Sequence, residues 1–260
     1  MPPVKIGVEL ASLRLPLRQA LFQAAQWGVD AVEIDARGEI TPDQLTETAA
    51  RQLRKMLDDL RLRVAAVGFR TRRGYETPED LDARVDATRA AMRMAYALRA
   101  PVVVNRVGRL PADANSPEWR LLVDVLADLG TFGHHNGALF AAETGNESGA
   151  DLARLLAALP SNAIGIDLNP GNLLLAGHSP LEAIEVLGPA ILHVHATDAI
   201  RDPSGRSGEP APLGQGSADL PAILGALDEH AYRGCFTIQH RTADDPQREI
   251  PQAIRYLRRL

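Results

Sequence analysis

Ile164-Gly165-Ile166-Asp167-Leu168-Asn169 is a short apolar run that closes on a polar residue. Runs of this length and composition are typical of strands buried inside a protein. Seven further runs share the pattern, at residues 4–9, 31–34, 64–69, 102–105, 138–143, 191–195 and 236–239. The chain is therefore expected to contain eight buried strands.

Longer stretches between these runs have the spacing of amphipathic helices, as in Leu53, Met56, Leu57 and Leu60. Four expected helix starts place a hydroxyl residue directly before a proline, which suits an N-cap followed by the first helical position: Thr41, Thr77, Ser116 and Ser179. Ser179 is also expected to form a capping box with Glu182.

Strand and helix alternate eight times in 260 residues, which is the order that a (β/α)8 TIM barrel of roughly 250 residues requires. We therefore predict the α/β class and a single barrel domain over residues 1–260. A doubly wound open sheet is the alternative, but the glycine-rich phosphate loop of that fold is missing after the first run.

The composition favours a globular domain that works in the cytoplasm. Hydrophobic residues make up 45% of the chain and can fill a large core, but no apolar stretch approaches the roughly 20 residues of a membrane span. Met1-Pro2-Pro3 leads directly into the first run, so no signal peptide is expected. A net charge of -5 argues against non-specific nucleic-acid binding. The single cysteine, Cys235, excludes an internal disulfide and is expected to pack as a small apolar residue.

In (β/α)8 barrels the reacting groups lie at the carboxyl ends of the strands, so the residues that end the runs are candidates for chemistry. In chain order they are Glu9, Glu33, Phe69-Arg70, Asn105, Glu143, Asn169, His195 and Gln239. Any one of them could be a solvated polar residue at the barrel mouth. Taken together, however, carboxylate, imidazole and amide oxygen are all groups that a divalent cation accepts. One divalent metal is therefore predicted to be held by Glu143, Asn169, His195 and Gln239.

Four segments carry a resemblance to a known family: Glu143-Thr144-Gly145-Asn146, Asn169-Pro170-Gly171-Asn172, His193-Val194-His195-Ala196-Thr197-Asp198 and Gly214-Gln215-Gly216. With them the chain resembles, over nearly its whole length, the xylose isomerase-like barrels grouped as sugar phosphate isomerases and epimerases. The resemblance implies a bound Mn, Mg, Co or Zn, held by Glu, Asp, His and Glu on strands five to eight. Here Asn169 and Gln239 replace the Asp and the second Glu, so two carboxylates have become amides.

The two amides change the charge of the predicted metal site. Three carboxylates around a divalent ion leave the site formally negative, whereas one carboxylate leaves it positive. Amide oxygens are weaker ligands for a hard cation, so the affinity for metal is expected to fall. A bound metal would be a stronger Lewis acid and would favour an anionic substrate. Arg201 matches a substrate-gripping arginine of the family's epimerases. Arg70, Arg72 and Arg73 could reach the same mouth, with a solvated loop as the equal alternative.

Gln239 also bears on the mechanism. The resemblance implies two glutamates that remove and return a proton on opposite faces of the carbon beside a carbonyl. An amide has no useful basicity, and the adjacent His240 is expected to point outward by strand alternation. Glu143 is thus the one base carried over. A single base suffices for a lyase or dehydratase, or for an isomerisation that returns the proton to the same face, so two-base epimerisation is disfavoured.

Two residues lie one step deeper in the predicted barrel. Asp167 is two residues before Asn169 on the same strand face, and we expect a buried partner, for example of Lys5, with replacement of the missing carboxylate as the alternative. His193 stands in the same relation to His195 and is expected to be an inner hydrogen-bonding histidine, with metal ligation as the alternative.

Three features beside the metal positions are expected to meet the substrate. Asp198 either orients His195, contacts substrate or caps a turn. Asn172 occupies a place where the resemblance implies a residue that binds a substrate hydroxyl. The irregular stretch 202–216 is long for a compact domain, so we expect a functional loop that borders the cavity together with Arg201.

The leading hypothesis is a metal-dependent isomerase or epimerase-like enzyme that acts on a small sugar, keto-sugar or cyclitol, with Glu143 as base and the metal polarising the carbonyl. Among enzymes the alternative is a lyase or dehydratase that uses Glu143 alone; outside enzymes it is a carbohydrate-binding pseudoenzyme with a degraded metal site. An abasic-site endonuclease ranks last, because strands two to four supply no histidine for a three-metal cluster. The expected partner is a small polyhydroxylated substrate, not a nucleic acid or a membrane, and a homo-oligomer is left open.

Overall fold

The computed structural model describes residues 4–201, 208–240 and 243–260. Eight parallel strands form a closed barrel: β1 (Lys5–Glu9), β2 (Ala31–Asp35), β3 (Arg63–Gly68), β4 (Val102–Asn105), β5 (Leu139–Glu143), β6 (Gly165–Leu168), β7 (Ile191–Ala196) and β10 (Cys235–Ile238). The order around the barrel is β1-β10-β7-β6-β5-β4-β3-β2, and it closes because β1 pairs with both β10 and β2. The predicted (β/α)8 TIM barrel is confirmed.

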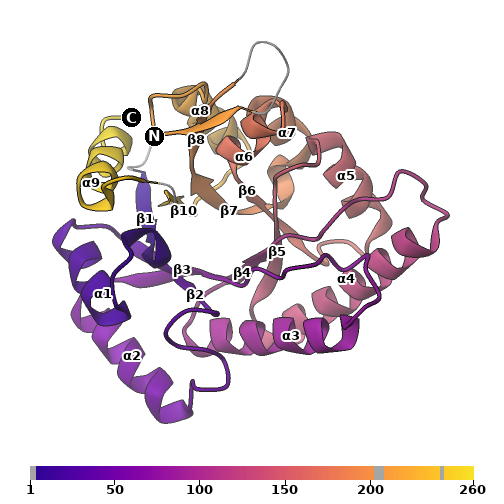
Figure 1. Ribbon diagram of the computed structural model, residues 1–260, viewed down its shortest axis with the longest axis horizontal. Coiled ribbons are helices and arrows are strands. Elements are labelled where there is room, and N and C mark those ends of the chain that lie inside the picture. Colours follow the sequence, from indigo (N-terminus) through magenta and orange to yellow (C-terminus); the bar gives the residue numbers. More distant parts are fainter. Residues whose placement is uncertain (1–3, 202–207, 241–242) are drawn as a thin grey trace.

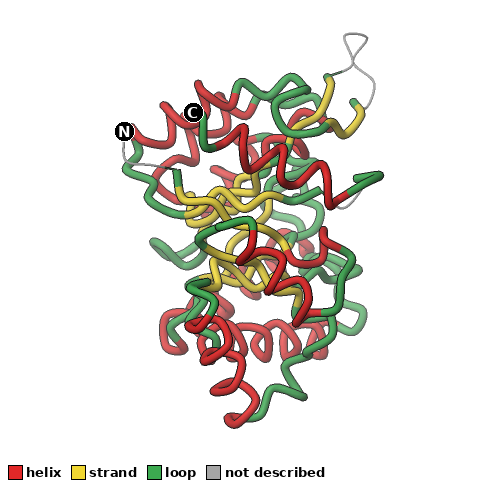
Figure 2. Tube along the Cα trace, turned by 90° about the vertical axis from the view of Figure 1, so that its left-hand side faces the viewer, coloured by secondary structure: helices red, strands yellow, loops and turns green. Residues whose placement is uncertain are grey.

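Helices surround the strands on the outside of the barrel (Figure 1). In chain order they are α1 (Leu17–Gln26), α2 (Glu47–Asp59), α3 (Leu81–Ala97), α4 (Pro117–Asn136), α5 (Gly149–Ala158), α6 (Pro170–Leu175), α7 (Pro180–Leu187), α8 (Leu220–Glu229) and α9 (Pro246–Leu257), with the 3-10 turns η1 (Leu10–Leu13) and η2 (Gly188–Ala190). Figure 2 shows the same layering from the side, with the barrel strands between helices. In the described part of the chain, none of the helices combines the length and apolar character that a bilayer crossing requires.

Two of the four predicted helix starts are confirmed. Ser116 caps α4 and Ser179 caps α7, each accepting a hydrogen bond from a backbone N–H of the first turn. The capping box, with both reciprocal hydrogen bonds, forms instead at the start of α5, between Ser148 and Asp151.

The other two helices begin later than predicted. The N-cap of α2 is Thr46, because Thr41-Pro42 heads a turn in which Gln44 N donates to Thr41 O at 3.0 Å. The residue before α3 is Asp80, whose φ of 54° lies in the left-handed region and delays the helix beyond Thr77.

Two strands lose their regular register directly before an inward carboxylate. In β2 the shift falls between Val32 and Glu33, and in β6 between Ile166 and Asp167. A register irregularity of this kind re-aims the next side chain. The neighbouring Gly68 leaves room for Glu33, because a Cβ at Gly68 would lie 2.7 Å from Glu33 Oε1. The strand irregularities thus place two carboxylates in the barrel interior.

A short antiparallel hairpin follows β7. It pairs β8 (Asp198–Ile200) with β9 (Glu209–Ala211), and it occupies part of the segment that we expect to be an irregular loop. Residues 202–207 of that segment lie outside the described residues. Cys235 begins β10 and is partly buried, and burial raises the pKa of its thiol, which favours the unreactive protonated form.

Candidate active site

The four residues predicted to hold a metal lie together at the carboxyl end of the barrel. Glu143 ends β5, Asn169 follows β6, His195 lies in β7 and Gln239 follows β10. Asn169 donates a hydrogen bond to Glu143 and another to Gln239. A ring nitrogen of His195 lies within 4.8 Å of a Glu143 carboxylate oxygen. The individual contacts of these side chains then decide which chemistry is open to them.

Glu143 is a buried carboxylate surrounded by donors. Its Oε1 accepts from Arg70 Nη2 at 2.7 Å, Asn169 Nδ2 at 2.9 Å and Asn172 Nδ2 at 3.1 Å, and its Oε2 accepts from Arg106 Nε at 3.4 Å. The two guanidinium groups thus bring positive charge to both of its oxygens. Arg70 reaches the mouth as predicted. Sequence reasoning does not single out Arg106, although its place directly after the fourth strand could have indicated it.

Asn169 turns its amide nitrogen toward Glu143. Its Oδ1 accepts from the backbone N–H of Asn172 at 3.0 Å, as the N-cap of α6, and from Thr197 Oγ1 at 2.6 Å. Because a backbone N–H can only donate, the amide oxygen must face it, which leaves the NH2 group toward Glu143. In this arrangement Asn169 presents a donor, not a lone pair, to the centre of the site.

Gln239 is oriented by the same reasoning. Its Nε2 donates to Glu9 Oε1 at 3.1 Å, and its Oε1 accepts from Asn169 Nδ2 at 3.3 Å. The two amides therefore connect the carboxylates of Glu9 and Glu143 in one hydrogen-bonded chain. As arranged, the four predicted residues do not fit a divalent ion, because the Asn169 oxygen is used at α6. Metal ligation by this set stays a prediction that requires the Asn169 amide to turn over.

His195 lies between two buried carboxylates. Its Nδ1 is 2.6 Å from Asp167 Oδ2, and its Nε2 is 2.7 Å from Glu33 Oε2. Burial disfavours the charged ring, but the two carboxylates outweigh burial and raise the pKa of His195 well above its ordinary value. Burial also opposes the charge on Glu33, yet His195 and His193 hold the Glu33 pKa well below its usual range. The ring and its two carboxylates form an internal ion-pair cluster.

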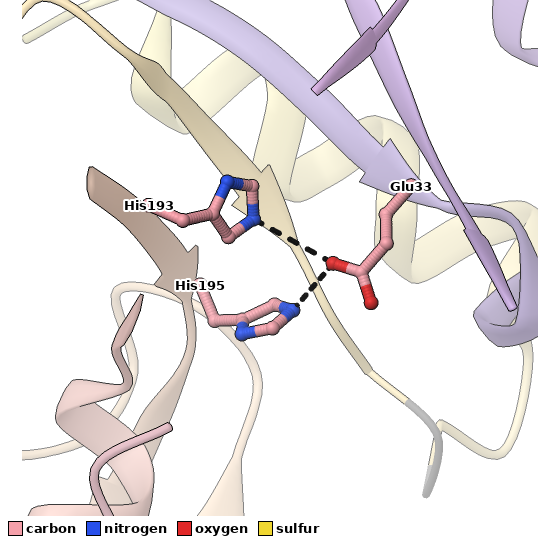
Figure 3. Close-up of side chains that lie close together, drawn as sticks. All are labelled: Glu33, His193 and His195. Atoms are coloured by element: carbon pink, nitrogen blue, oxygen red, sulfur yellow. Dashed lines mark hydrogen bonds and ion pairs between the residues drawn. The ribbon is translucent and has the colours of Figure 1, made fainter. Parts of the chain in front are cut away.

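Asp167 is a buried partner inside the barrel, as predicted, but its partner is His195. The expected pairing with Lys5 is wrong, because Lys5 Nζ donates to Arg233 O at the opposite end of the barrel. His193 lies one step deeper than His195, and the two rings meet edge to face. Its Nε2 is 3.5 Å from Glu33 Oε2 and makes no hydrogen bond within the described residues. Both rings point at the same Glu33 oxygen (Figure 3).

Two groups of side chains in the described ranges could hold a metal ion. One is Glu33, His193 and His195, and the other is Glu143, Asp167 and His195. In each group the ligand atoms lie within 4.8 Å of one another. The second group uses Asp167 in place of the amide of Asn169. His195 belongs to both groups, so both candidate sites depend on it.

A cavity of ≈ 130 Å³ opens beside these residues, and its lining includes Asn169, Asn172, Asp198 and Gln239. Pro210, Ala211 and Leu213 of the segment after β8 also line it, so the described part of this segment is a wall of the cavity.

Asp198 organises the loop that follows it. Its carboxylate accepts four backbone hydrogen bonds of 2.8 to 3.0 Å, from Ala199, Gly214, Gly216 and Ala218. This is the capped-turn alternative of the sequence analysis. Arg201 is exposed, and its Nη2 donates to Gly177 O at 3.2 Å rather than lining the cavity. The substrate contacts expected of Arg201, Asp198 and Asn172 stay predictions.

Comparison with known proteins places this geometry among related barrels. A curated inosose dehydratase from Clostridium beijerinckii is 24% identical over 142 residues, and the match spans about half of each protein, 48% of this chain and 48% of the relative. A solved xylose isomerase domain protein from Planctomyces limnophilus is 25% identical with a TM-score of 0.86, over 99% of this chain and 96% of that chain.

Two further solved structures share the fold. One is a xylose isomerase-like TIM barrel protein from Mycobacterium smegmatis in complex with magnesium, at 19% identity and a TM-score of 0.77, over 98% of this chain and 96% of that one. The other is a D-tagatose 3-epimerase-like protein, at 20% identity and a TM-score of 0.77, over 98% of each chain. The family model for the xylose isomerase-like TIM barrel matches residues 21–260, and this chain therefore belongs to that family.

Proposed function

We propose that the chain is a metal-dependent isomerase or epimerase-like enzyme for a small sugar, keto-sugar or cyclitol that carries an anionic group. The observation that carries the proposal is the buried Glu143 carboxylate, held between Arg70 and Arg106 at the mouth of a xylose isomerase-like barrel. A carboxylate in this place can remove a proton from the carbon beside a carbonyl. Asn172 and the other polar residues of the adjacent cavity offer partners for hydroxyl groups.

The two arginines account for the anionic group. While Arg70 and Arg106 hold Glu143, both of its carboxylate oxygens are occupied by their donors and are not free to accept a proton from a substrate. Their side chains are 31% and 50% exposed, whereas that of Glu143 is 0% exposed. A carboxylate or phosphate of the substrate would draw the guanidinium groups toward itself. Substrate binding would then release Glu143 to act as a base.

A divalent metal, Mn, Mg, Co or Zn, is part of the proposal. His195 would be among its ligands, since both groups that could hold an ion contain this residue. When bound, the metal supplies positive charge that can polarise a carbonyl group. A barrel of the same fold is a magnesium complex, which supports the choice of a divalent ion.

A dehydratase that uses Glu143 as its sole base is the second candidate. The match to an inosose dehydratase favours it, and so does Gln239, whose amide cannot return a proton from the opposite face. Both candidates begin with the same proton removal. They differ in the product, because a dehydratase releases water and an isomerase does not.

The test is proton exchange beside the carbonyl, followed by NMR in D2O with Mn²⁺ present. The substrates are neutral keto-sugars and cyclitol ketones, each matched with an acid or phosphate form. We expect exchange that favours the anionic member of each pair, and a loss of at least about 100-fold in Glu143→Gln. A product that has lost water identifies the dehydratase.

Arg70→Met should raise KM for the anionic member by about 10- to 150-fold, since a hydrogen bond to a charged group contributes roughly 1.5–3 kcal/mol. KM for the neutral member should not change. Arg72→Met is the matched control, because Arg72 is an exposed arginine in the same loop. Exchange that persists in Glu143→Gln contradicts the proposal. No exchange with any substrate would also contradict it, and would leave the carbohydrate-binding pseudoenzyme.

A further inference from the structure

The geometry points to a metal site formed by Glu33, His193 and His195 in the barrel interior, in which Asp167 orients His195. This inference rests on the divalent metal of the proposed function and gives it a location inside the barrel. The ligands come from β2 and β7, which are separated by β1 and β10 in the barrel order. An ion at this site would therefore join two strands across the interior.

The three ligand atoms already converge. Glu33 Oε2 is 2.7 Å from His195 Nε2 and 3.5 Å from His193 Nε2, and all three atoms lie within 4.8 Å of one another. Ligands at about 2.0–2.2 Å from a tetrahedral ion are roughly 3.3–3.5 Å apart. The distance from Glu33 Oε2 to His193 Nε2 already has this value, and the distance from Glu33 Oε2 to His195 Nε2 must increase by only about 0.6 Å. Figure 3 shows both rings directed at the one carboxylate oxygen.

Three buried polar atoms near this cluster make no hydrogen bond in the described part of the chain. Asp167 Oδ1, His193 Nε2 and Thr237 Oγ1 make no hydrogen bond within the described residues. They lie on β6, β7 and β10, three consecutive strands of the barrel. Buried polar atoms in folded proteins are nearly always satisfied. Buried atoms without hydrogen bonds on three neighbouring strands indicate a missing ligand, and a metal ion would bind His193 Nε2 directly.

The surroundings of the cluster fit a metal site as well. Asp167 Oδ2 lies 2.6 Å from His195 Nδ1, so an ion would replace the proton of Nε2, which faces Glu33, in the arrangement that carboxylates give many metal-bound histidines. The register shifts in β2 and β6 directly precede Glu33 and Asp167. These irregularities aim both carboxylates inward, and Gly68 provides the space that Glu33 occupies.

Charge decides between the two groups that could hold an ion. Glu143 has two guanidinium groups at 2.7 and 3.4 Å, so a divalent cation bound to it would lie beside two positive charges. Glu33 instead contacts two imidazoles, which are neutral when they bind a metal. Glu33 and Asp167 together then balance the two charges of the ion. Two nitrogens and one oxygen favour Zn²⁺ or Co²⁺ over Mg²⁺.

One ligand of the site borders a cavity. His193 lines a cavity of ≈ 560 Å³ at the amino-terminal end of the barrel, together with the first residues of several strands. Lys5 and Arg63 line the same cavity and repel cations. We therefore expect slow loading and slow loss of the ion.

The test compares metal content in matched variants. The protein is stripped with a chelator and incubated for hours with Zn²⁺ or Co²⁺. Metal per chain and the visible absorption of Co²⁺ are then measured. We expect one ion per chain in the wild type, at least a tenfold loss of affinity in Glu33→Gln and His193→Gln, and retention in Glu143→Gln. His135→Gln, an exposed histidine of α4, is the control and should also retain the ion. Asp167→Asn should weaken binding by about 10- to 100-fold.

A measurement on the wild type covers the case in which a variant does not fold. Ring ¹⁵N resonances of His193 and His195 should both shift on addition of Zn²⁺, whereas those of His135 should not. Loss of metal in Glu143→Gln with retention in His193→Gln would overturn the inference and leave the proposed function intact. A wild type that binds no ion after prolonged loading would overturn both this site and the metal dependence, while the exchange assay still judges Glu143 as a base.

Discussion

Asn169→Asp should destabilise the protein in the absence of divalent metal, and a divalent metal should reverse the loss. In the native protein Asn169 Nδ2 donates to Glu143 Oε1 at 2.9 Å, while Oδ1 caps α6. Aspartate can keep the cap with one oxygen, but its second oxygen then takes the place of the donor. Two carboxylate oxygens would face each other where a hydrogen bond was.

The expected magnitude follows from that distance. Two unit charges 2.9 Å apart repel by about 6 kcal/mol at an effective dielectric constant of about 20. Arg70, at 2.7 Å from the same Glu143 oxygen, offsets part of the repulsion, and side-chain relaxation removes more. We expect a net loss of about 2–4 kcal/mol, which corresponds to a fall in Tm of about 4–16 °C for a domain of this size.

The assay is thermal unfolding followed by circular dichroism, with EDTA and then with Mn²⁺. In EDTA, Asn169→Asp should unfold at the lower temperature, and Mn²⁺ should restore most of the loss, because a cation between the two carboxylates replaces the missing donor. Asn115→Asp makes the same chemical change at an exposed position and should not move Tm. A variant as stable as the wild type in EDTA would refute the orientation assigned to the Asn169 amide. The double variant Asn169→Asp, Gln239→Glu adds a carboxylate opposite Glu9. Its Tm should therefore fall further in EDTA and should rise by more when Mn²⁺ is added.

Three further perturbations concern stability. His195 and Glu33 should make unfolding pH-dependent. The raised His195 pKa stabilises the fold below pH 6.5, and this contribution fades as pH rises through the folded pKa, whereas the lowered Glu33 pKa stabilises the fold above pH 4.5, and this contribution is lost on acidification. Urea unfolding should therefore show both contributions in full between pH 4.5 and 6.5. Gly68→Ala should lower stability by about 1–3 kcal/mol through overpacking against Glu33, while Gly145→Ala, where a Cβ meets nothing within 4 Å, should be close to neutral in the same titration. Asp198→Asn should speed amide hydrogen exchange at Gly214, Gly216 and Ala218. The carboxylate accepts these hydrogen bonds on two oxygens, whereas the amide of the variant has only one oxygen that can accept them. Unchanged exchange would show that the loop does not depend on this side chain.

Much of the fold could be predicted because it depends on local order. Apolar runs and helical spacing are properties of neighbouring residues, and eight repeats of strand and helix leave few ways to bury the apolar faces. The residues that meet at the barrel mouth can be predicted from the same strand pattern, since parallel strands bring their carboxyl ends to one side. The predicted helix starts at Thr41 and Thr77 are too early, because α2 begins after Thr46 and α3 after Asp80. Local cap residues do not determine at which residue the chain leaves a loop and packs a helix on the barrel.

By itself the sequence determined the barrel, the strand ends that share its mouth, and the exchange of two carboxylates for amides at Asn169 and Gln239. Only the tertiary structure decided which end of each amide faces inward, because that depends on the α6 backbone and on Glu9. It alone also brought Glu33 to His195, which is 162 residues away in the chain. Such contacts form when the barrel closes and two register shifts turn carboxylates into its interior, and neither event is visible in the residues on either side of a single strand end.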